Sequence, residues 1–144
     1  DQGYLDSFPG FRGVTVLQPL GLNLAPWNTA GHDILRSGKG VTVDNEPLVF
    51  FHFHALTRTG SWWVSSQLVY GSPMTKVLRR DVYEPYIRRL EAHTAVVAES
   101  ALVPHTATAA RGAGLRGILF RARKAALTVM SVLTGNAVRG SESG

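Results

Sequence analysis

Two histidines and an arginine follow one apolar run in the middle of the chain. Residues 48–51 are β-forming apolar residues, and His52, His54 and Arg58 come directly after them. In an extended chain, residues two apart point to the same face, so the two imidazoles can act as a ligand pair. Neutral imidazole binds manganese or zinc, and a guanidinium binds phosphate. The residue types therefore fit a metal–phosphate site, or else two structural histidines and a solvated arginine.

Polar residues that suit sugar chemistry occur in two places nearer the start. At the beginning of the sequence, Asp1, Gln2 and Asp6 combine carboxylates with an amide, which can hold a sugar hydroxyl or assist a leaving group. The same carboxylates also suit the N-terminus of a helix. In the irregular loop 21–28, Trp27 offers an indole face and Asn28 a bidentate amide. The alternative is an indole that fills the rim of the core.

Composition excludes several classes of protein. The chain has no cysteine, so disulfides, zinc–thiolate sites and cysteine nucleophiles are ruled out. The absence of cysteine suits a reducing compartment, and neither a signal peptide nor an apolar run of the roughly 18 residues that span a bilayer is recognisable in the sequence. Residues 1–104 carry nine basic and nine acidic side chains, so the net charge of +5 comes from residues 105–144. A basic tail on a neutral body is not typical of nucleic-acid binding, and we expect no nucleic-acid partner.

The elements that must position these residues indicate the α/β class. The run 48–51 predicts a fully buried central strand, and the carboxyl end of such a strand is where open α/β sheets bind ligands. Further strands are predicted at 14–17, 32–36 and 40–43, with a tight turn over 44–47. A helix is predicted over 82–98, with Asp81 as its N-cap and Glu84 completing the capping box.

The sequence divides into four parts. We expect one domain over 1–100, an Ala/Thr/Gly-rich linker over 101–114, a basic amphipathic helix over 115–134 and a disordered tail over 135–144. The helix has an apolar arc on one side and four basic residues on the other. It can lie on an anionic membrane face, or it can pack its apolar face on the domain and leave its basic face in water.

The order of these motifs resembles that of nucleotide-sugar-dependent glycosyltransferases. The opening Asp1-Gln2-Gly3-Tyr4-Leu5-Asp6 resembles the Asp-Gln-Gly-x-Leu-Asn motif of glycogenin-like, retaining enzymes. The stretch His52-Phe53-His54-Ala55-Leu56-Thr57-Arg58 resembles their motif His-Phe-x-Gly-x-x-Lys-Pro-Trp.

A closer likeness is to bacterial nucleotide-diphospho-sugar transferases of polysaccharide gene clusters. Those enzymes also carry Leu-Ala-Pro-Trp-Asn, matched here by 24–28, and Phe-Phe-His-Phe-His, matched by 50–54. The resemblance runs from residue 1 to about 90. It implies the C-terminal half of a GT-A fold, followed by the amphipathic helix. Ala55 stands in place of the family glycine, Thr59-Gly60 in place of Pro-Trp, and Asp6 in place of asparagine.

The resemblance also implies roles for individual residues. His52 matches the ligand of a divalent metal, manganese or else magnesium, on the donor diphosphate, and His54 is the second candidate. Arg58 matches the lysine that contacts that diphosphate. Asp1 and Gln2 match catalytic positions near the anomeric carbon. The substrate-binding candidates are Asp6, Trp27, Asn28 and Arg58.

The implied activity is metal-assisted transfer of a sugar from a nucleotide-diphosphate-sugar donor to a glycan or a lipid-linked acceptor. Such an enzyme would work in the cytoplasm or peripherally at the inner membrane. The family's Asp-x-Asp motif, which precedes these stretches, does not occur in the sequence. We therefore expect this chain by itself to bind the donor weakly and to turn nothing over.

Two other kinds of protein fit the same residues. One is a non-catalytic carbohydrate- or nucleotide-binding module that uses Trp27, Trp62 and Trp63 as stacking platforms. Metal-independent sugar binding, unchanged in a His52→Ala variant, would distinguish it. The other is a purely structural protein, which would bind no such ligand.

Overall fold

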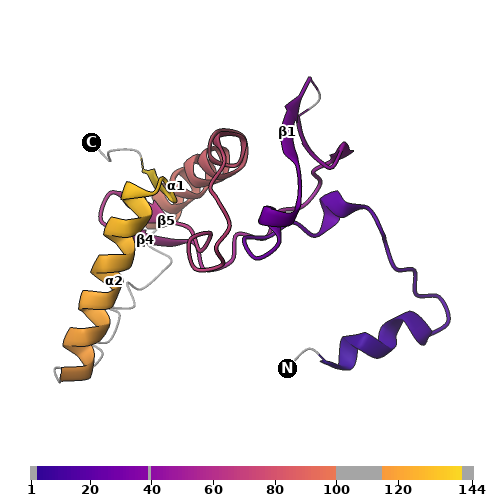
Figure 1. The fold of residues 1–144 in the computed structure, drawn as a ribbon, viewed down its shortest axis with the longest axis horizontal. Coiled ribbons are helices and arrows are strands. Elements are labelled where there is room, and N and C mark those ends of the chain that lie inside the picture. The colour runs from indigo at the N-terminus through magenta and orange to yellow at the C-terminus, as the bar shows by residue number, and fades with distance from the viewer. Residues whose placement is uncertain (1–2, 39, 100–114, 141–144) are drawn as a thin grey trace.

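The computed structural model describes residues 3–38, 40–99 and 115–140 of the chain (Figure 1). These residues form a mixture of helices and short strands, which confirms the prediction of a mixed α/β protein at that level. Short 3-10 helices are η1 (Gly3–Gly10), η2 (Leu20–Leu22) and η3 (Thr29–Gly31). The strands are β1 (Ile34–Ser37), β2 (Gly40–Val43), β3 (Glu46–Pro47), β4 (Thr57–Thr59), β5 (Trp62–Val64) and β6 (Ala137–Arg139). The longer helices are α1 (Glu84–Glu99) and α2 (Leu115–Leu133), and a π-helical turn, η4 (Leu78–Tyr83), precedes α1.

The first sheet is an antiparallel meander in the order β1-β2-β3. Strands β1 and β2 pair from Ile34↔Val43 to Ser37↔Gly40, which confirms the two predicted strands, although β1 covers Ile34–Ser37 and not 32–36. Asp44 and Asn45, between β2 and β3, have φ values of 48° and 73°. Two positive φ values match the turn that a two-residue antiparallel connection favours.

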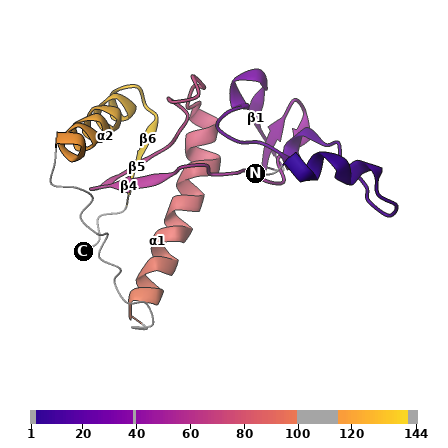
Figure 2. The same ribbon diagram turned by 90° about the horizontal axis from the view of Figure 1, so that it is seen from below.

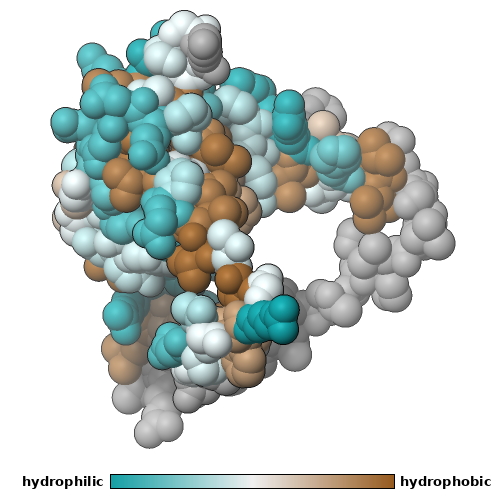
Figure 3. Space-filling view, turned by 90° about the vertical axis from the view of Figure 1, so that its right-hand side faces the viewer, coloured by the Kyte–Doolittle hydropathy of each residue, from teal (hydrophilic) through white to brown (hydrophobic). Residues whose placement is uncertain are grey.

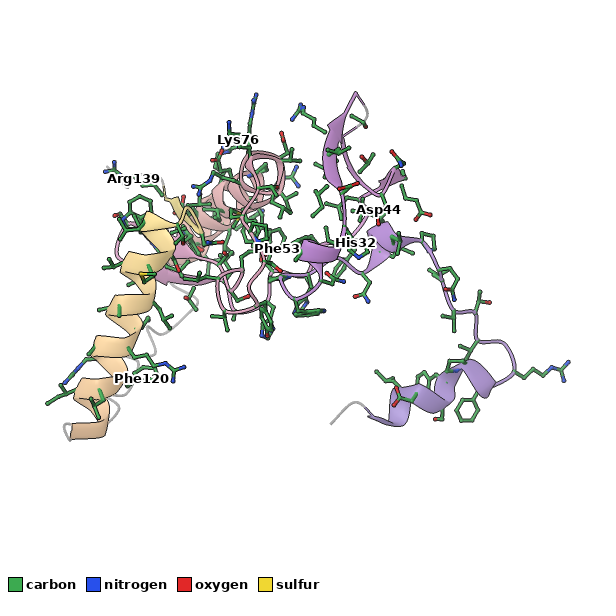
Figure 4. All side chains as sticks on the ribbon, in the orientation of Figure 1. His32, Asp44, Phe53, Lys76, Phe120 and Arg139 are labelled. Carbon is green, nitrogen blue, oxygen red and sulfur yellow. The ribbon has the colours of Figure 1, made fainter. Side chains whose placement is uncertain are left out.

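An imidazole–carboxylate pair holds the base of this hairpin. His32 Nδ1 lies 2.7 Å from Asp44 Oδ2, and Figure 4 shows the two side chains next to each other. The other carboxylate oxygen of Asp44 accepts the backbone N–H of Asp33 at 2.7 Å. The hydrogen bond from His32, followed by that from Asp33, lowers the pKa of Asp44 from its ordinary value.

The second sheet joins distant parts of the chain in the order β4-β5-β6, and it lies between α1 and α2 (Figure 2). Val64 of β5 pairs with Ala137 of β6. Arg79 secures this strand, because one of its guanidinium nitrogens donates to the carbonyl of Ala137 at 2.8 Å and the other donates to the carbonyl of Gly135. The expectation of disorder over 135–144 is therefore wrong for these residues, since β6 is a paired and largely buried strand.

The helix that leads into α1 starts earlier than the sequence predicts. It begins at Lys76, where the hydroxyl of Thr75 accepts the N–H of Leu78 at 3.1 Å. The predicted cap, Asp81, lies inside the helix and forms an ion pair with Arg36 of β1 instead. The helix widens just before Pro85, and the N–H of Glu84 bonds to the carbonyl of Arg79, five residues back. A proline removes one helical donor and crowds the preceding turn, which a π-turn accommodates.

The core is built from both sheets, η4, α1 and the loops at Leu24 and Phe51, and not from a central strand. Its buried residues are Leu24, Ile34, Val43, Phe51, Leu78, Val82, Tyr83, Ile87 and Val138. The predicted strand over 48–51 is wrong: only Phe51 pairs, through one parallel bridge to Leu24, and Val49 and Phe50 are 68% and 55% exposed. Residues 14–17 form no strand either and are exposed. Viewed from the right of Figure 1, hydrophobic side chains reach the surface among hydrophilic ones (Figure 3).

Helix α2 confirms the helical pattern predicted over 115–134. It packs on β5 and β6 and stands at one end of the molecule, while η1 lies apart from the other elements at the opposite end (Figure 1). Within the described part of the chain, no helix combines the length and apolar character needed to cross a membrane. The predicted linker, 101–114, lies outside the described residues.

The lowered pKa of Asp44 predicts an acid-sensitive hairpin. A carboxylate with a depressed pKa stabilises the folded chain fully above its ordinary value of 3.8 and loses that contribution as the pH falls through the lowered value. Asp44→Asn should therefore lower the free energy of unfolding at pH 7 and flatten its fall between pH 5 and pH 2, roughly the range where Asp groups titrate. Urea denaturation at a series of pH values measures this effect. An unchanged slope in Asp44→Asn would contradict the prediction.

Candidate functional site

Two loops that are distant in sequence run side by side at the centre of the molecule. The carbonyl of Gly21 accepts the N–H groups of both Val49 and Phe50 at 2.9 Å. Further along, the carbonyl of Leu24 accepts the N–H of His52 at 2.8 Å, next to the parallel bridge between Leu24 and Phe51. Residues 21–28 and 48–54 therefore form one unit, and these segments include the most specific parts of the family resemblance, 23–28 and 49–54.

The close approach depends on the absence of a side chain at Gly21. A Cβ placed there would lie 1.9 Å from the carbonyl oxygen of Pro47 and 3.1 Å from the Cα of Leu48. Real Cβ atoms do not come that near to backbone, so any other residue would push the loops apart. A sequence pattern does not reveal this role, because glycine is also common in loops that touch nothing.

Four rings meet where the two loops end, and we call Trp27, His52, His54 and Tyr70 the ring cluster. The ring centroid of Trp27 lies 5.4 Å from that of His52 and 5.4 Å from that of His54. The two imidazoles are stacked at 5.7 Å with an interplanar angle of 25°. Tyr70 closes the group, with its ring centroid 6.0 Å from those of both Trp27 and His54. Such spacings are those of favourable aromatic pairs.

Successive side chains of residues 51–54 point alternately toward the core and toward solvent, and the ring cluster lies on the solvent side. Phe51 and Phe53 point the other way and pack on α1 and the turn before it: Phe51 lies 5.4 Å from Tyr83, and Phe53 stacks on Tyr86 at 3.8 Å. His52 and His54 are exposed, and Trp27 is 45% exposed. The two imidazoles are therefore open to a ligand, as the same-face rule predicted.

Asn28 holds the loop that carries Trp27. Its side-chain oxygen accepts the N–H of Ala25 at 2.8 Å, and its side-chain nitrogen donates to the carbonyl of Asn23 at 2.8 Å. Both ends of the amide are thus bonded within the loop. The geometry gives Asn28 a positioning role, and contact with a substrate would require one of these hydrogen bonds to be shared.

Support for the histidine loop comes from the stretch 65–72, which shows no periodic pattern in its sequence. The hydroxyl of Ser66 donates to the carbonyl of His54 at 2.7 Å. Beside it, fully buried Gln67 accepts the hydroxyl of Thr29 at 2.9 Å, which ties this stretch to the end of the Trp27 loop. Ser66 and Tyr70 follow no motif spacing relative to His52 and His54 in the sequence, so only tertiary contacts identify them as members of the site.

Beneath the site, Tyr83 is a packing residue. Burial raises the pKa of its hydroxyl well above the ordinary value, so the phenol stays neutral across the physiological range. Its ring packs edge-on against Phe51 and Phe53. Tyr83 therefore supports the backbone under the ring cluster and is no candidate for proton transfer.

Other residues singled out in the sequence lie outside the ring cluster. The guanidinium of Arg58, on β4, lies 5.9 Å from the ring centroid of Trp63, and its Nε donates to the carbonyl of Gly60 at 3.3 Å. Asp6 is on η1, apart from the elements that carry the cluster (Figure 1). Asp1 and Gln2 lie outside the described residues.

The two exposed imidazoles are the candidate metal ligands of the ring cluster. Among residues 3–38, 40–99 and 115–140, no group of three or more His, Asp or Glu side chains could hold an ion. Imidazole nitrogen is a ligand for divalent transition metals, and two imidazoles would leave the remaining coordination positions to oxygen ligands or water. A metal at the ring cluster would therefore need further ligands from a bound molecule or from water.

Comparison with known proteins gives limited information. No family model and no solved structure matches the chain. A stretch of 58 residues is 36% identical to the uncharacterized protein YfnD of Bacillus subtilis (strain 168). That match covers 40% of this chain and 19% of the bacterial protein, so the chain corresponds to about a fifth of its relative, and the relative's function is not described.

The close approach at Gly21 makes a prediction about stability. Gly21→Ala should lower the free energy of unfolding by about 2–4 kcal/mol, because the new methyl group overlaps backbone that cannot move without breaking hydrogen bonds. Urea denaturation followed by tryptophan fluorescence measures the change. Gly31→Ala is the matched control, because a Cβ there meets nothing within 4 Å. Equal stabilities of the two variants would contradict the close packing.

Ala55 makes a second prediction, of opposite sign. Its φ of 51° lies in the left-handed region, where an L-residue with a Cβ is strained by about 1–2 kcal/mol, and the resembled family has glycine at this position. Ala55→Gly should therefore stabilise the chain by about 0.5–1 kcal/mol after the extra backbone entropy of glycine is subtracted. The control is Ala126→Gly in α2, which should destabilise by about 1 kcal/mol. If Ala55→Gly destabilised as much as the control, the left-handed conformation would be excluded.

Proposed function

We propose that this chain is part of a metal-dependent glycosyltransferase that uses a nucleotide-diphosphate-sugar donor. The observation that carries the proposal is the parallel contact between residues 21–28 and 48–54. Two stretches that each resemble a transferase motif are adjacent in space. The rings of Trp27, His52 and His54, which come from these stretches, form one solvent-open cluster. A GT-A architecture for the complete enzyme is part of the same proposal.

In this proposal the ring cluster receives the diphosphate end of the donor. His52, with His54 beside it, would hold a divalent metal, manganese or magnesium, which when bound stabilises negative charge on the departing nucleoside diphosphate. Trp27 and Tyr70 would stack against a sugar or a base and exclude water from one side of it. Asn28 and Ser66 keep the two loops in place and so preserve the spacing of the rings.

The remaining roles stay proposals from the resemblance. Arg58 would contact the diphosphate after leaving Trp63, while Asp1 and Gln2 would act near the anomeric carbon. Asp6 would contact the sugar only if η1 approached the ring cluster. The acceptor would be a glycan or a lipid-linked glycan.

A carbohydrate-binding module is the second candidate, and the exposure of Trp27 and Tyr70 favours it. These residues are 45% and 43% exposed, and their rings are 6.0 Å apart with an interplanar angle of 71°. Exposed aromatic faces of this kind bind sugars without a metal. In that case the imidazoles of His52 and His54 would pack beside Trp27 and Tyr70 without binding a metal.

Manganese and UDP together should bind at the ring cluster. We expect traces of Mn²⁺ to broaden the imidazole NMR signals of His52 and His54, and UDP or a UDP-sugar to strengthen the effect, since the nucleotide completes the coordination. Paramagnetic broadening also detects weak binding. His52→Ala should weaken the UDP-dependent broadening at His54 by roughly tenfold or more, as expected when one ligand of a shared metal is lost.

The exposed His93 on α1 supplies the matched control, His93→Ala, which should change nothing at the ring cluster. Broadening that is equal at His93 and His52, or that does not respond to UDP, would rule out a donor–metal site here. Sugar-induced shifts of the Trp27 indole signal that need no metal and persist in His52→Ala would favour the binding module instead.

A further inference from the structure

Helix α2 covers the second sheet with its polar side. Ser131, which is 2% exposed, and the half-buried Thr128 line a small cavity between the helix and β4–β5. Lys124 and Leu127 line the same cavity at its rim. Small polar side chains allow the helix to approach the sheet closely, and the helix contacts both β5 and β6.

The apolar side of α2 is left uncovered. Ile118, Leu119, Val129, Met130 and Leu133 are between 50% and 76% exposed. At about 100° per residue these five positions lie within an arc of about 120°, and we call them the apolar arc. The exposed Phe120 and Leu127 lie outside the arc, beyond Arg123 and closer to the side that carries Ser131. Figure 4 shows Phe120 on the half of α2 that is remote from the central residues around Phe53.

Basic residues border this arc without acidic counterparts. Residues 115–133 contain four basic side chains and no acidic one. Arg121 and Arg123 are exposed, and at helical spacing they lie about 60° and about 20° outside the two edges of the arc. Long basic side chains in such positions can extend to phosphate groups while the arc between them is buried in lipid.

The charges argue against a second copy of the chain as the occupant. In a symmetric pair of helices that meet through the apolar arc, the middle of one helix faces the middle of the other. Arg121 and Arg123 lie near that middle, so a self-complementary contact would bring like charges together. An anionic surface has the charge that suits the helix.

We propose that α2 docks the protein on an anionic lipid bilayer, lying in the plane of the interface. From Ile118 to Leu133 the arc is about 22 Å long, so it lies along the surface and does not span the membrane. This inference does not depend on the transferase proposal, because it uses none of the ring-cluster residues.

Vesicle binding tests the proposal. The intact chain should co-sediment with vesicles of equal parts phosphatidylglycerol and phosphatidylcholine, and much less with phosphatidylcholine alone. Ile118→Gln/Val129→Gln should reduce the partition coefficient roughly tenfold, through loss of buried apolar area. Arg121→Gln/Arg123→Gln should reduce it roughly 30-fold, which corresponds to about 1 kcal/mol for each basic residue near such a surface. Val96→Gln on α1, also an exposed helical valine, is the matched control and should bind as the wild type does.

A site-specific reporter guards against effects on folding. The chain has no cysteine, so Leu119→Cys accepts a single environment-sensitive dye, whose emission should shift to the blue with anionic vesicles, whereas the same dye on Val96→Cys should not respond. Three results would overturn the proposal: no shift at residue 119, equal binding by the Ile118→Gln/Val129→Gln variant, or a lipid-free dimer that this double variant dissociates.

Discussion

The contact between Gly21 and the backbone of 47–50 is the constraint on which the candidate site depends. One carbonyl accepts two successive N–H groups, which is possible only because no side chain separates the two segments at that point. The parallel bridge at Leu24 follows, and Trp27 then lies beside the two histidines. Alternation after Phe51 sends the phenylalanines into the core and the imidazoles to solvent. A backbone contact thus determines the geometry of a side-chain cluster.

The sequence predicted those features of the site that depend on neighbouring residues. It did not predict those that depend on contacts between distant parts of the chain. Residue type and the same-face rule were enough to predict that His52 and His54 are adjacent. The resemblance was needed to group them with Trp27. Tyr70 joins the cluster from a stretch without periodicity, so no spacing could reveal it. For Asn28 the residue type suggested direct sugar binding, whereas the structure shows that both ends of its amide are hydrogen-bonded within the loop. These hydrogen bonds cannot be read from the sequence.

The same division explains the fold. The hairpin of β1 and β2 and helix α2 were predicted because turns and helical periodicity are local properties. The apolar run 48–51 was misread as a central strand, since composition does not tell how many neighbours a strand has. Strand β6 was missed because its partner, β5, is more than 70 residues earlier in the chain. The start of the helix before α1 was missed because Asp81, a good cap by type, pairs with Arg36 of a distant strand.

Helix α2 shows how connectivity can override hydrophobicity. Its sequence predicts two faces but not which of them meets the domain. The chain leaves α2 through Gly135, at φ 75°, and enters β6 almost at once, while the guanidinium of Arg79 bonds the carbonyls of Gly135 and Ala137. Pairing of β6 with β5 therefore fixes the rotation of the helix about its axis and brings Ser131 inward. The apolar arc has to face outward as a result, and we propose that an anionic bilayer covers it.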